Sequence, residues 1–208
     1  MDRNIEPAVS SFREIKPKIL YYGMPTILLT TLNEDGTTNI SPLSSSWALG
    51  DSIVLGIGLG GKALENIQRH PECVINLPSP DLWINIEKIA SFTGLEEVPE
   101  YKRKMGFTYK KDKFEAAQIT PLKSKTVKPV RIEECPIQIE VKVMNVRFPD
   151  YNPHFAIVET KMVHFHALKD IIQKDHYIDP NKWSPLIYNF RHYFAIGKEM
   201  GKTFRSET

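Results

Sequence analysis

The sequence predicts an α+β fold that is mainly β, with helices at its periphery. Three observations indicate this: a β-hairpin pattern in residues 26–40, strict alternation of apolar and polar residues over 136–146, and short helical segments in the first half of the chain. With 208 residues, 41% of them hydrophobic, and no low-complexity tract, the chain suffices for one ordinary globular domain. We expect a single domain over residues 1–208, whose terminal extensions pack on it or on a partner copy.

The first half of the chain is expected to mix strands and helices. The turn sequence Asn33-Glu34-Asp35-Gly36 lies between two runs rich in β-branched residues, which is a hairpin signal. A helix of about two turns follows the third strand and ends at Pro71. In chain order we expect strands at 26–32, 37–40 and 52–58, a helix at 63–70 and a strand at 73–77.

Two more helices and two long strands are expected further along. Asp81 is expected to cap a helix that runs through Ile89, because Leu82, Ile86 and Ile89 have helical spacing. Another helix is expected at 99–105, ended by Gly106, with a charged turn at 110–113. Over 136–146, residues Ile137, Ile139, Val141 and Val143 alternate with Gln138, Glu140, Lys142 and Met144, and a second long strand is expected at 155–165.

Composition excludes several classes of function. The net charge is +2 and basic residues are interspersed with acidic ones, so we expect no nucleic-acid partner. No apolar run approaches the roughly 20 residues that span a bilayer, and the polar start of the chain lacks a signal core, so we expect a cytoplasmic protein without a membrane partner. Cys73 and Cys135 lie in apolar contexts without metal-ligand spacing, which indicates buried thiols.

Two loops suggest a binding site. The first, Ser41-Pro42-Leu43-Ser44-Ser45-Ser46-Trp47, offers hydroxyl and amide groups to a polar ring edge. The second is glycine-rich, ends in Lys62 and precedes a predicted helix, a context that suits a phosphate. Together the loops fit a flat, phosphorylated ligand such as flavin mononucleotide (FMN).

The glycine-rich loop also matches two other nucleotide fingerprints. Read as G-x-x-x-x-G-K, it is followed by Ala63, which lacks the hydroxyl that a P-loop needs for magnesium. Read as G-x-G-x-x-G, it has Asp81 at the distance of a Rossmann ribose acid. A Rossmann fold needs further βαβ units after this motif, but long antiparallel strands follow instead. We therefore favour neither the P-loop nor the Rossmann interpretation.

Short motifs in a fixed order resemble one known family over nearly the whole chain, the flavin reductase-like, FMN-binding split-barrel proteins. The motifs are 25–31 followed by Asp35-Gly36, Asn39-Ile40-Ser41-Pro42-Leu43-Ser44, Asn66-Ile67, Val74-Ile75-Asn76-Leu77-Pro78, Asp112-Lys113-Phe114-Glu115, Lys128-Pro129-Val130-Arg131-Ile132, and Pro185-Leu186-Ile187-Tyr188 before His192-Tyr193-Phe194. The resemblance implies a Greek-key split β-barrel with peripheral helices. It also implies a homodimer that holds FMN near the subunit interface.

The resemblance assigns cofactor-binding roles along the two loops. The first loop would line the isoalloxazine ring, with the serines at its pyrimidine edge, and the second would meet the phosphate. Many relatives carry a threonine at the position of Ala63, so one hydroxyl contact is missing here. The residues expected to bind the cofactor are Asn39, Ser41, Pro42, Ser44, Ser45, Ser46, Trp47, Gly60, Gly61, Lys62 and Asn76.

The expected activity follows from the resemblance. NADH or NADPH, as co-substrate, would give hydride to the bound FMN, which would reduce free flavin, another small molecule or a protein acceptor. No catalytic residue is expected, because the cofactor carries the chemistry. The alternative is a flavoredoxin-like electron carrier or flavin-binding protein without NAD(P)H turnover. His164 and His166 share one strand face but lack an obvious third ligand, so no metal site is expected.

Overall fold

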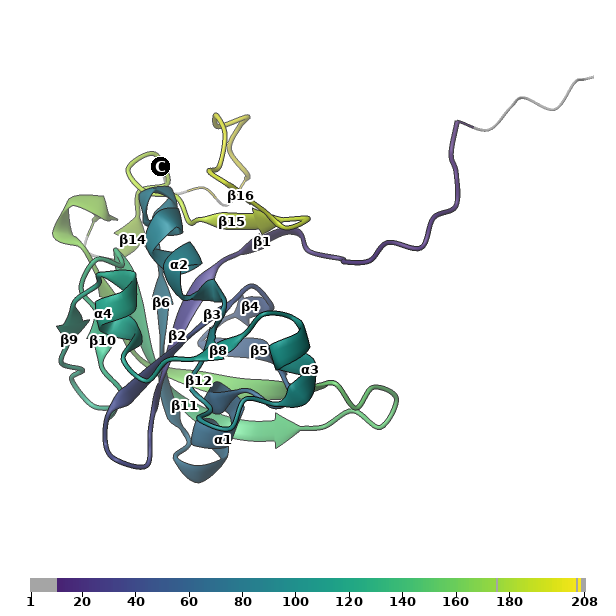
Figure 1. The fold of residues 1–208 in the computed structure, drawn as a ribbon. Helices are drawn as coiled ribbons and strands as arrows, with labels where there is room; N and C mark the ends of the chain where they lie inside the picture. Colours follow the sequence, from purple (N-terminus) through teal and green to yellow (C-terminus); the bar gives the residue numbers. More distant parts are fainter. Residues whose placement is uncertain (1–10, 175, 205, 207–208) are drawn as a thin grey trace, which may run out of the picture.

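An antiparallel sheet of seven strands forms the centre of the protein (Figure 1). The structure is a computed structural model that describes residues 11–174, 176–204 and 206. The strand order is β3-β2-β6-β11-β12-β5-β4. The strands are β2 (Ile27–Leu32), β3 (Thr38–Leu43), β4 (Ser46–Leu49), β5 (Ser52–Gly58), β6 (Glu72–Leu77), β11 (Ile137–Arg147) and β12 (Phe155–Ala167). The predicted strands are therefore confirmed, with differences at their ends. The loop predicted at 41–47 is shorter than expected, because β3 continues to Leu43 and the unpredicted strand β4 begins at Ser46.

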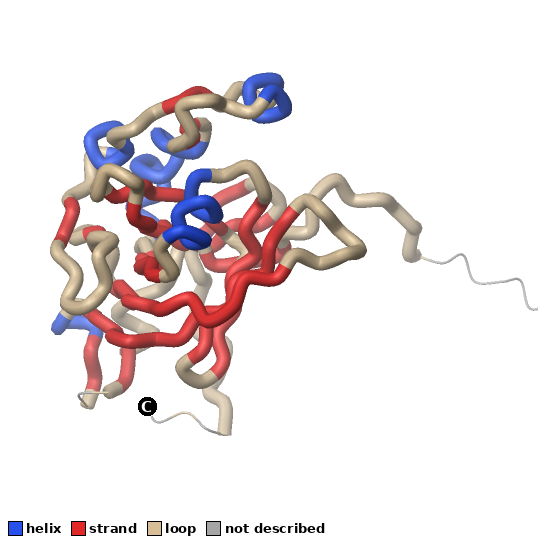
Figure 2. Tube along the Cα trace, turned by 90° about the horizontal axis from the view of Figure 1, so that it is seen from below, coloured by secondary structure: helices blue, strands red, loops and turns tan. Residues whose placement is uncertain are grey.

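The sheet curls into a half-barrel because its two edge strands are consecutive in the sequence. β3 and β4 lie at opposite edges, yet only Ser44 and Ser45 connect them. Three steps along the chain span at most about 11 Å, so the two edges must approach each other. Figure 2 shows the strands curving around the interior. The predicted split-barrel class is confirmed, and the serine-rich loop lies where the edges meet.

The helices are short and lie outside the sheet. They are α1 (Lys62–Arg69), α2 (Trp83–Ala90), α3 (Glu100–Lys104) and α4 (Lys113–Ala117), with 3-10 turns η1 (Pro80–Leu82) and η2 (Lys169–Ile171). The helices predicted at 63–70 and 99–105 are confirmed. The predicted cap at Asp81 is wrong, because Asp81 lies inside η1 and α2 begins at Trp83. The turn predicted at 110–113 leads into α4, which Asp112 caps by accepting a hydrogen bond from the Glu115 amide at 3.0 Å.

Shorter strands complete the fold, and one small sheet ties the two ends of the described chain together. In that sheet β1 pairs with β15, which pairs with β16. Tyr188 extends the contact, with its ring 5.4 Å from that of Tyr21 and 5.7 Å from that of Tyr193. The short strands are β1 (Tyr22–Pro25), β7 (Phe92–Thr93), β8 (Thr108–Tyr109), β9 (Pro121–Leu122), β10 (Arg131–Ile132), β13 (Ile172–Gln173), β14 (Tyr177–Ile178), β15 (Ile187–Asn189) and β16 (His192–Phe194).

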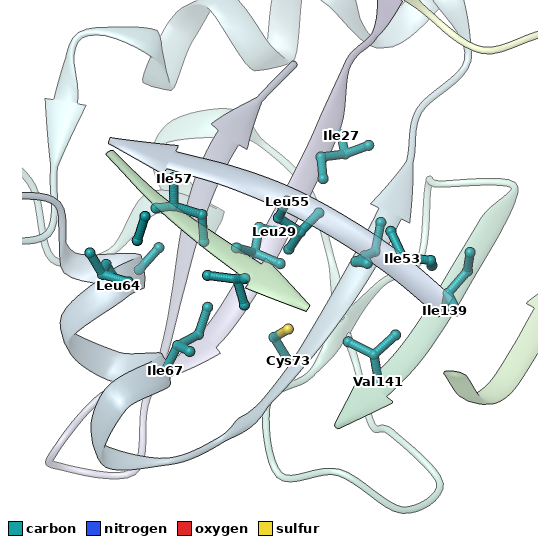
Figure 3. Packing of buried hydrophobic residues seen from close by; sticks show 14 of the residues in the cluster. Ile27, Leu29, Ile53, Leu55, Ile57, Leu64, Ile67, Cys73, Ile139 and Val141 are labelled. Atoms are coloured by element: carbon teal, nitrogen blue, oxygen red, sulfur yellow. The ribbon is translucent and has the colours of Figure 1, made fainter. Parts of the chain in front are cut away.

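Two apolar clusters cover both faces of β2. Ile27 and Leu29 point into the half-barrel, where Leu55 and the α1 residues Leu64 and Ile67 join them (Figure 3). Each such fully buried side chain stabilises the fold by about 1.5–3 kcal/mol. On the other face, Leu28 belongs to a second cluster, which α2 and α4 supply with Ile86, Ile89 and Ala117. Because both faces are covered, β2 is buried along almost its whole length rather than at alternate residues.

The alternating strand β11 is buried on its polar side as well. Glu140 is fully buried and accepts hydrogen bonds from the amides of Lys125, Thr126 and Val127 at 2.7–3.1 Å. His166 on β12 completes the contact at 2.7 Å. Burial alone would raise the pKa of Glu140, but these hydrogen bonds outweigh it and lower the pKa to about 2. The carboxylate therefore anchors the 123–128 loop on the sheet.

The cysteines and the two histidines of β12 have well-defined surroundings in the fold. Cys73 and Cys135 are free and buried, as predicted, and burial raises the pKa of the Cys73 thiol to about 12. His164 hydrogen-bonds Thr126 rather than sharing a ligand with His166. Within the described residues, no cluster of histidines, cysteines and carboxylates is suited to a metal ion. Nor does any helix of the described chain have the length and apolar character needed to cross a membrane.

Candidate functional site

The serine-rich loop packs tightly against β5. The amide of Gly56 donates to the Ser45 carbonyl at 2.8 Å. A Cβ atom at Gly56 would lie only 3.0 Å from the Cβ of Ser45, so a glycine lets the two segments approach. The Ser45 hydroxyl donates to the Tyr21 hydroxyl at 3.0 Å, which links the loop to the start of β1. These contacts fix the loop where the two sheet edges meet.

An open groove of about 910 Å³, here called the β4–β12 groove, begins at this loop. Of the predicted cofactor-binding residues, Ser45, Ser46 and Trp47 line it. Ser46 is buried, whereas 58% of the Trp47 surface is exposed. The rest of its lining comes mainly from β1, β5, β11 and β12: Leu20, Tyr21, Tyr22, Met24, Ser52, Val54, Leu55, Gly56, Met144, Arg147, Phe155, Ile157, Glu159 and Thr160.

The glycine-rich loop follows directly on the end of β5 that packs against Ser45, and Gly58, Gly60 and Gly61 are not part of the groove lining. Gly60 has a φ of +66°, which favours glycine, and Gly61 is the N-cap of α1. Because Gly61 has no side chain, it supplies no capping acceptor to the first turn of α1. That turn therefore presents backbone donors and the positive end of the helix dipole.

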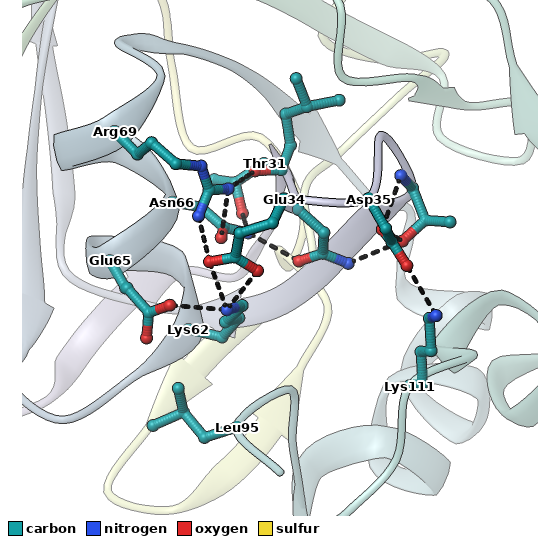
Figure 4. Close-up of polar contacts among 12 residues, drawn as sticks. Thr31, Glu34, Asp35, Lys62, Glu65, Asn66, Arg69, Leu95 and Lys111 are labelled. Atoms are coloured by element: carbon teal, nitrogen blue, oxygen red, sulfur yellow. Dashed lines mark hydrogen bonds and ion pairs between the residues drawn. The ribbon is translucent and has the colours of Figure 1, made fainter.

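Lys62 is held by acidic neighbours (Figure 4). Its Nζ lies 3.0 Å from Glu34 and 2.6 Å from Glu65, and Arg69 also pairs with Glu34. Burial alone would lower the pKa of Lys62, but the hydrogen bonds that it donates to Glu65 and Glu34 outweigh burial and raise the pKa. The ammonium group thus joins the hairpin turn between β2 and β3 to α1, and its charge is already compensated.

Asn39 lies beside the stem of Lys62, and its side chain is incompletely satisfied. It is 1% exposed and donates through Nδ2 to the Ser41 hydroxyl at 3.1 Å, while Oδ1 has no partner among the described residues. A Cβ atom at Gly94 would lie 2.5 Å from this oxygen and 3.1 Å from Lys62 Cβ. The segment after β7 therefore comes this close only because it carries a glycine.

Helix α3 covers the glycine-rich loop. The Tyr101 hydroxyl donates to the Leu59 carbonyl at 2.8 Å and lies 2.6 Å from where a Cβ of Gly60 would be. Lys102 Nζ lies 3.6 Å from where a Cβ of Gly61 would be. Burial lowers the pKa of Lys102, which is partly exposed. The helix thus carries an ammonium group to the N-cap of α1.

Lys113 adds a second cation near Lys102. It is 3% exposed and donates to the Ile40 carbonyl at 2.8 Å. Burial, followed by repulsion from Lys102, lowers its pKa to about 8. None of the ion pairs within the described part of the chain includes Lys102 or Lys113. This end of the site therefore carries uncompensated positive charge.

The remaining candidates lie within the sheet or at its edge. Asn76 is fully buried in β6, donates to the Leu28 carbonyl at 2.9 Å and accepts from the Ile132 amide at 2.9 Å, so its amide is used inside the protein. Ser41 and Pro42 lie on the edge strand β3, where a proline without an amide hydrogen is tolerated. Ser44 lies in the connection to β4.

The predicted residues thus form two groups near the C-terminal end of β5. Ser45, Ser46 and Trp47 lie at the groove, whereas Asn39, Gly60, Gly61 and Lys62 surround the N-terminus of α1. Along β5, from Gly56 to Gly60, the chain spans at most about 14 Å. The sequence analysis missed Gly94, Tyr101, Lys102 and Lys113. Lys113 belongs to the family motif Asp112-Lys113-Phe114-Glu115, whereas only the basic composition of residues 102–113 hinted at Lys102, and it resembles an ordinary solvated surface.

Comparisons with known proteins agree with this fold. The family described as "Flavin reductase like domain" matches residues 20–197. The uncharacterized protein YdfE of Bacillus subtilis is 66% identical over 197 residues, which cover 95% of each chain. Flavoredoxin of Desulfovibrio vulgaris superposes with a TM-score of 0.75 at 19% identity, covering 95% of this chain and 100% of its own. The FMN-binding domain of a flavin reductase-like enzyme from Shewanella baltica gives 0.64 at 14% identity, covering 86% and 89%.

These findings define the class of protein as a flavin reductase-type split barrel. The chain belongs to the flavin reductase-like family, because the family match extends over most of its length. Membership supports flavin binding and an oxidoreductase role.

Proposed function

We propose that this chain binds FMN and acts as an NAD(P)H-dependent oxidoreductase. Hydride would come from NADH or NADPH, and electrons would leave to free flavin or to another small-molecule or protein acceptor. Bound flavin supplies the capacity to accept a hydride and release electrons. The contributions of the chain are to bind the cofactor, orient it and control access to it.

The observation that carries this proposal is the unmatched positive charge at the N-terminus of α1. The first turn of α1 has no side-chain cap, and the ammonium group of Lys102 lies beside it without a carboxylate partner in the described chain. A phosphate dianion would satisfy the backbone donors and compensate the charge. The glycines at positions 60, 61 and 94 let the side chains of Tyr101, Lys102 and Asn39 approach this turn closely. The residues present therefore fit a phosphorylated ligand.

The serine-rich loop fits the opposite end of such a ligand. Ser44 and Ser45 lie between the edge strands, next to the groove. Donors held there would stabilise negative charge on the pyrimidine edge of a reduced flavin. The Tyr21 hydroxyl accepts a hydrogen bond from Ser45, so its own hydrogen remains available to a ligand or water. Asn76 is better explained as a sheet residue, because its amide is already engaged.

We also propose that the protein is a cytoplasmic homodimer. Apolar side chains are exposed in and beside the β4–β12 groove, among them Trp47, Leu49 and Met144. Patches of this kind mark association surfaces. The two reduced, buried cysteines are consistent with a reducing compartment.

Anaerobic stopped-flow spectroscopy tests the proposed reductase activity. The purified protein is loaded with FMN and mixed with NADH or NADPH, and the visible absorbance of oxidised flavin is followed. We expect this absorbance to disappear with a rate that saturates with at least one of the two nucleotides. If FMN binds but neither nucleotide reduces it, the reductase proposal is wrong and the electron-carrier alternative remains. Free FMN mixed with the same nucleotides is the control.

A further inference from the structure

The phosphate end of the proposed site contains three lysines whose charges differ in availability. Lys62, the cation predicted from the sequence, is enclosed by Glu34 and Glu65. Glu34 and Glu65 balance the charges of Lys62 and Arg69, so this cluster offers no net attraction for a phosphate. Lys113 is buried and directs a hydrogen bond to the Ile40 carbonyl. Lys102 is partly exposed, and it forms no ion pair within the described residues.

The position of Lys102 is fixed by its helix. Its neighbour Tyr101 anchors α3 on the glycine-rich loop through the Leu59 carbonyl. The ring of Phe107 lies 5.7 Å from the Lys102 ammonium, a weak cation–π contact. Within the part of the chain that the structure describes, this ammonium group donates no hydrogen bond. Next to Gly61, the ammonium group and the uncapped first turn of α1 point positive charge into the same space. Two such groups repel each other unless an anion lies between them.

Unsatisfied Asn39 is an independent indication of a ligand here. Its Oδ1 is buried without a partner, next to the Lys62 stem and Gly94. Leaving a buried polar atom unpaired costs about 1–3 kcal/mol. A hydroxyl of a bound ligand would satisfy the oxygen as it stands. If the amide were turned over, Nδ2 would instead become a donor to the anion.

We propose that Lys102, held in place by α3, is the residue that binds the phosphate of the flavin nucleotide, together with the first-turn amides of α1. This inference rests on the proposed function. It assigns Lys62 a structural role, joining the β2–β3 turn to α1. It also makes α3 a strap over the phosphate and predicts selection of phosphorylated flavins over riboflavin, which has the same ring but no phosphate.

Binding of FMN and of riboflavin to the apoprotein tests the proposal, with quenching of flavin fluorescence as the readout. Removing the charge in Lys102→Met should weaken FMN binding roughly tenfold to a hundredfold, as expected for a charge-assisted hydrogen bond, and should leave riboflavin binding nearly unchanged. Lys102→Gln should behave in the same way. Lys102→Arg keeps the charge and should retain most of the FMN affinity.

The matched control is Lys104→Met. Lys104 lies on the same helix and has the same charge, but its side chain is 74% exposed and pairs with Glu100. Its removal should change FMN affinity less than about twofold. If the FMN-to-riboflavin affinity ratio is the same in Lys102→Met, Lys102→Gln and the wild type, Lys102 does not bind the phosphate. That outcome overturns this inference but not the proposed function. A wild-type protein that binds neither flavin overturns the proposed function and this inference with it.

Discussion

Lys113 places a cation in the interior of the fold, which makes stability depend on pH. Burial, followed by repulsion from Lys102, lowers its pKa from 10.5 to about 8. Between these values the unfolded chain keeps the proton and the folded chain releases it. The unfolded state therefore binds more protons, and the contribution of this group to the free energy of unfolding rises with pH.

Urea unfolding of the apoprotein from pH 8 to 10.5 measures this effect. We expect the wild type to gain stability relative to Lys113→Met over this range, by up to about 3 kcal/mol. Lys104→Met, which removes an exposed lysine, should show no comparable trend. A stability difference between wild type and Lys113→Met that stays constant with pH would contradict the interpretation.

Gly94 is a second single residue on which the packing of the site depends. An alanine would place its Cβ 2.5 Å from Asn39 Oδ1 and 3.1 Å from the Lys62 side chain. Gly94→Ala should therefore destabilise the protein by about 1–3 kcal/mol and weaken FMN binding. Gly58→Ala is the control, since a Cβ there meets nothing within 4 Å. Equal melting temperatures for the two variants would show that the Gly94 contact is not constraining.

The conformation and burial of individual residues could be predicted where the local sequence determines them. Gly36, in the predicted hairpin turn, has a φ of +82°, and Cys73 is buried in its strand. The state of Lys62 could not be predicted in this way. Its partner Glu34 is 28 positions away, and Lys102, the alternative cation, reaches Gly61 only through the folding of α3 onto the loop. Charge compensation is a tertiary property.

At the scale of elements, β11 shows how a buried carboxylate holds a loop. Replacing Glu140 by glutamine keeps the shape but removes the charge that accepts three backbone hydrogen bonds and the contact with His166. We expect Glu140→Gln to lower the free energy of unfolding by about 2–4 kcal/mol at neutral pH. Urea unfolding checks this value, with Glu159→Gln as the control, since Glu159 is a half-buried carboxylate on β12 that pairs only with the side chains of Arg147 and Asn145 among the described residues.

The lowered pKa of Glu140 also predicts how the stability of the protein changes at acidic pH. The pKa of Glu140 is lowered from 4.5 to about 2, so its contribution is complete above pH 4.5 and is lost as the pH falls towards 2. The stability difference between wild type and Glu140→Gln should shrink over this interval. A difference that persists unchanged down to pH 2 would mean that packing, not charge, is responsible.

Element prediction succeeded where periodicity and turn residues agree. The strand predicted at 52–58 coincides with β5, and the short helix before Pro71 is α1. It failed where another segment changes the environment. The second helix begins after a 3-10 turn that contains Asp81. The five-residue helix α4 was overlooked because no proline or glycine marks its ends, as Pro99 and Gly106 mark those of α3. Gln138 and Glu140 were expected on a polar face, yet residues 123–132 cover them.

At the scale of the whole molecule, the exposed apolar surface predicts association. Trp47 is 58% exposed in the β4–β12 groove, beside Leu49 at 76%. Trp47→Glu should convert the expected dimer into a monomer in analytical ultracentrifugation, because a charge would be buried without a partner. Tyr151→Glu changes an aromatic residue that is 82% exposed outside the groove and should remain dimeric. A wild type that sediments as a monomer would refute the dimer.

The fold class was predictable because the order of short motifs restricts the topology. The closure of the sheet was not predictable from any one segment. It depends on the pairing of β12 with β5, whose residues are about a hundred positions apart, for example Thr160 and Ile53 at 107. The two parts of the site meet because the β4–β5 hairpin places Ser45 against Gly56, a few residues before Gly61.

A crystal structure with FMN tests the central claim most directly. We predict that the phosphate lies at the N-terminus of α1, roughly 2.7–3.1 Å from the amides of Lys62 and Ala63 and from Lys102 Nζ, with the ring beside Ser44 and Ser45. A phosphate in any other position, with the space between Gly61 and Lys102 occupied only by water, would contradict the account.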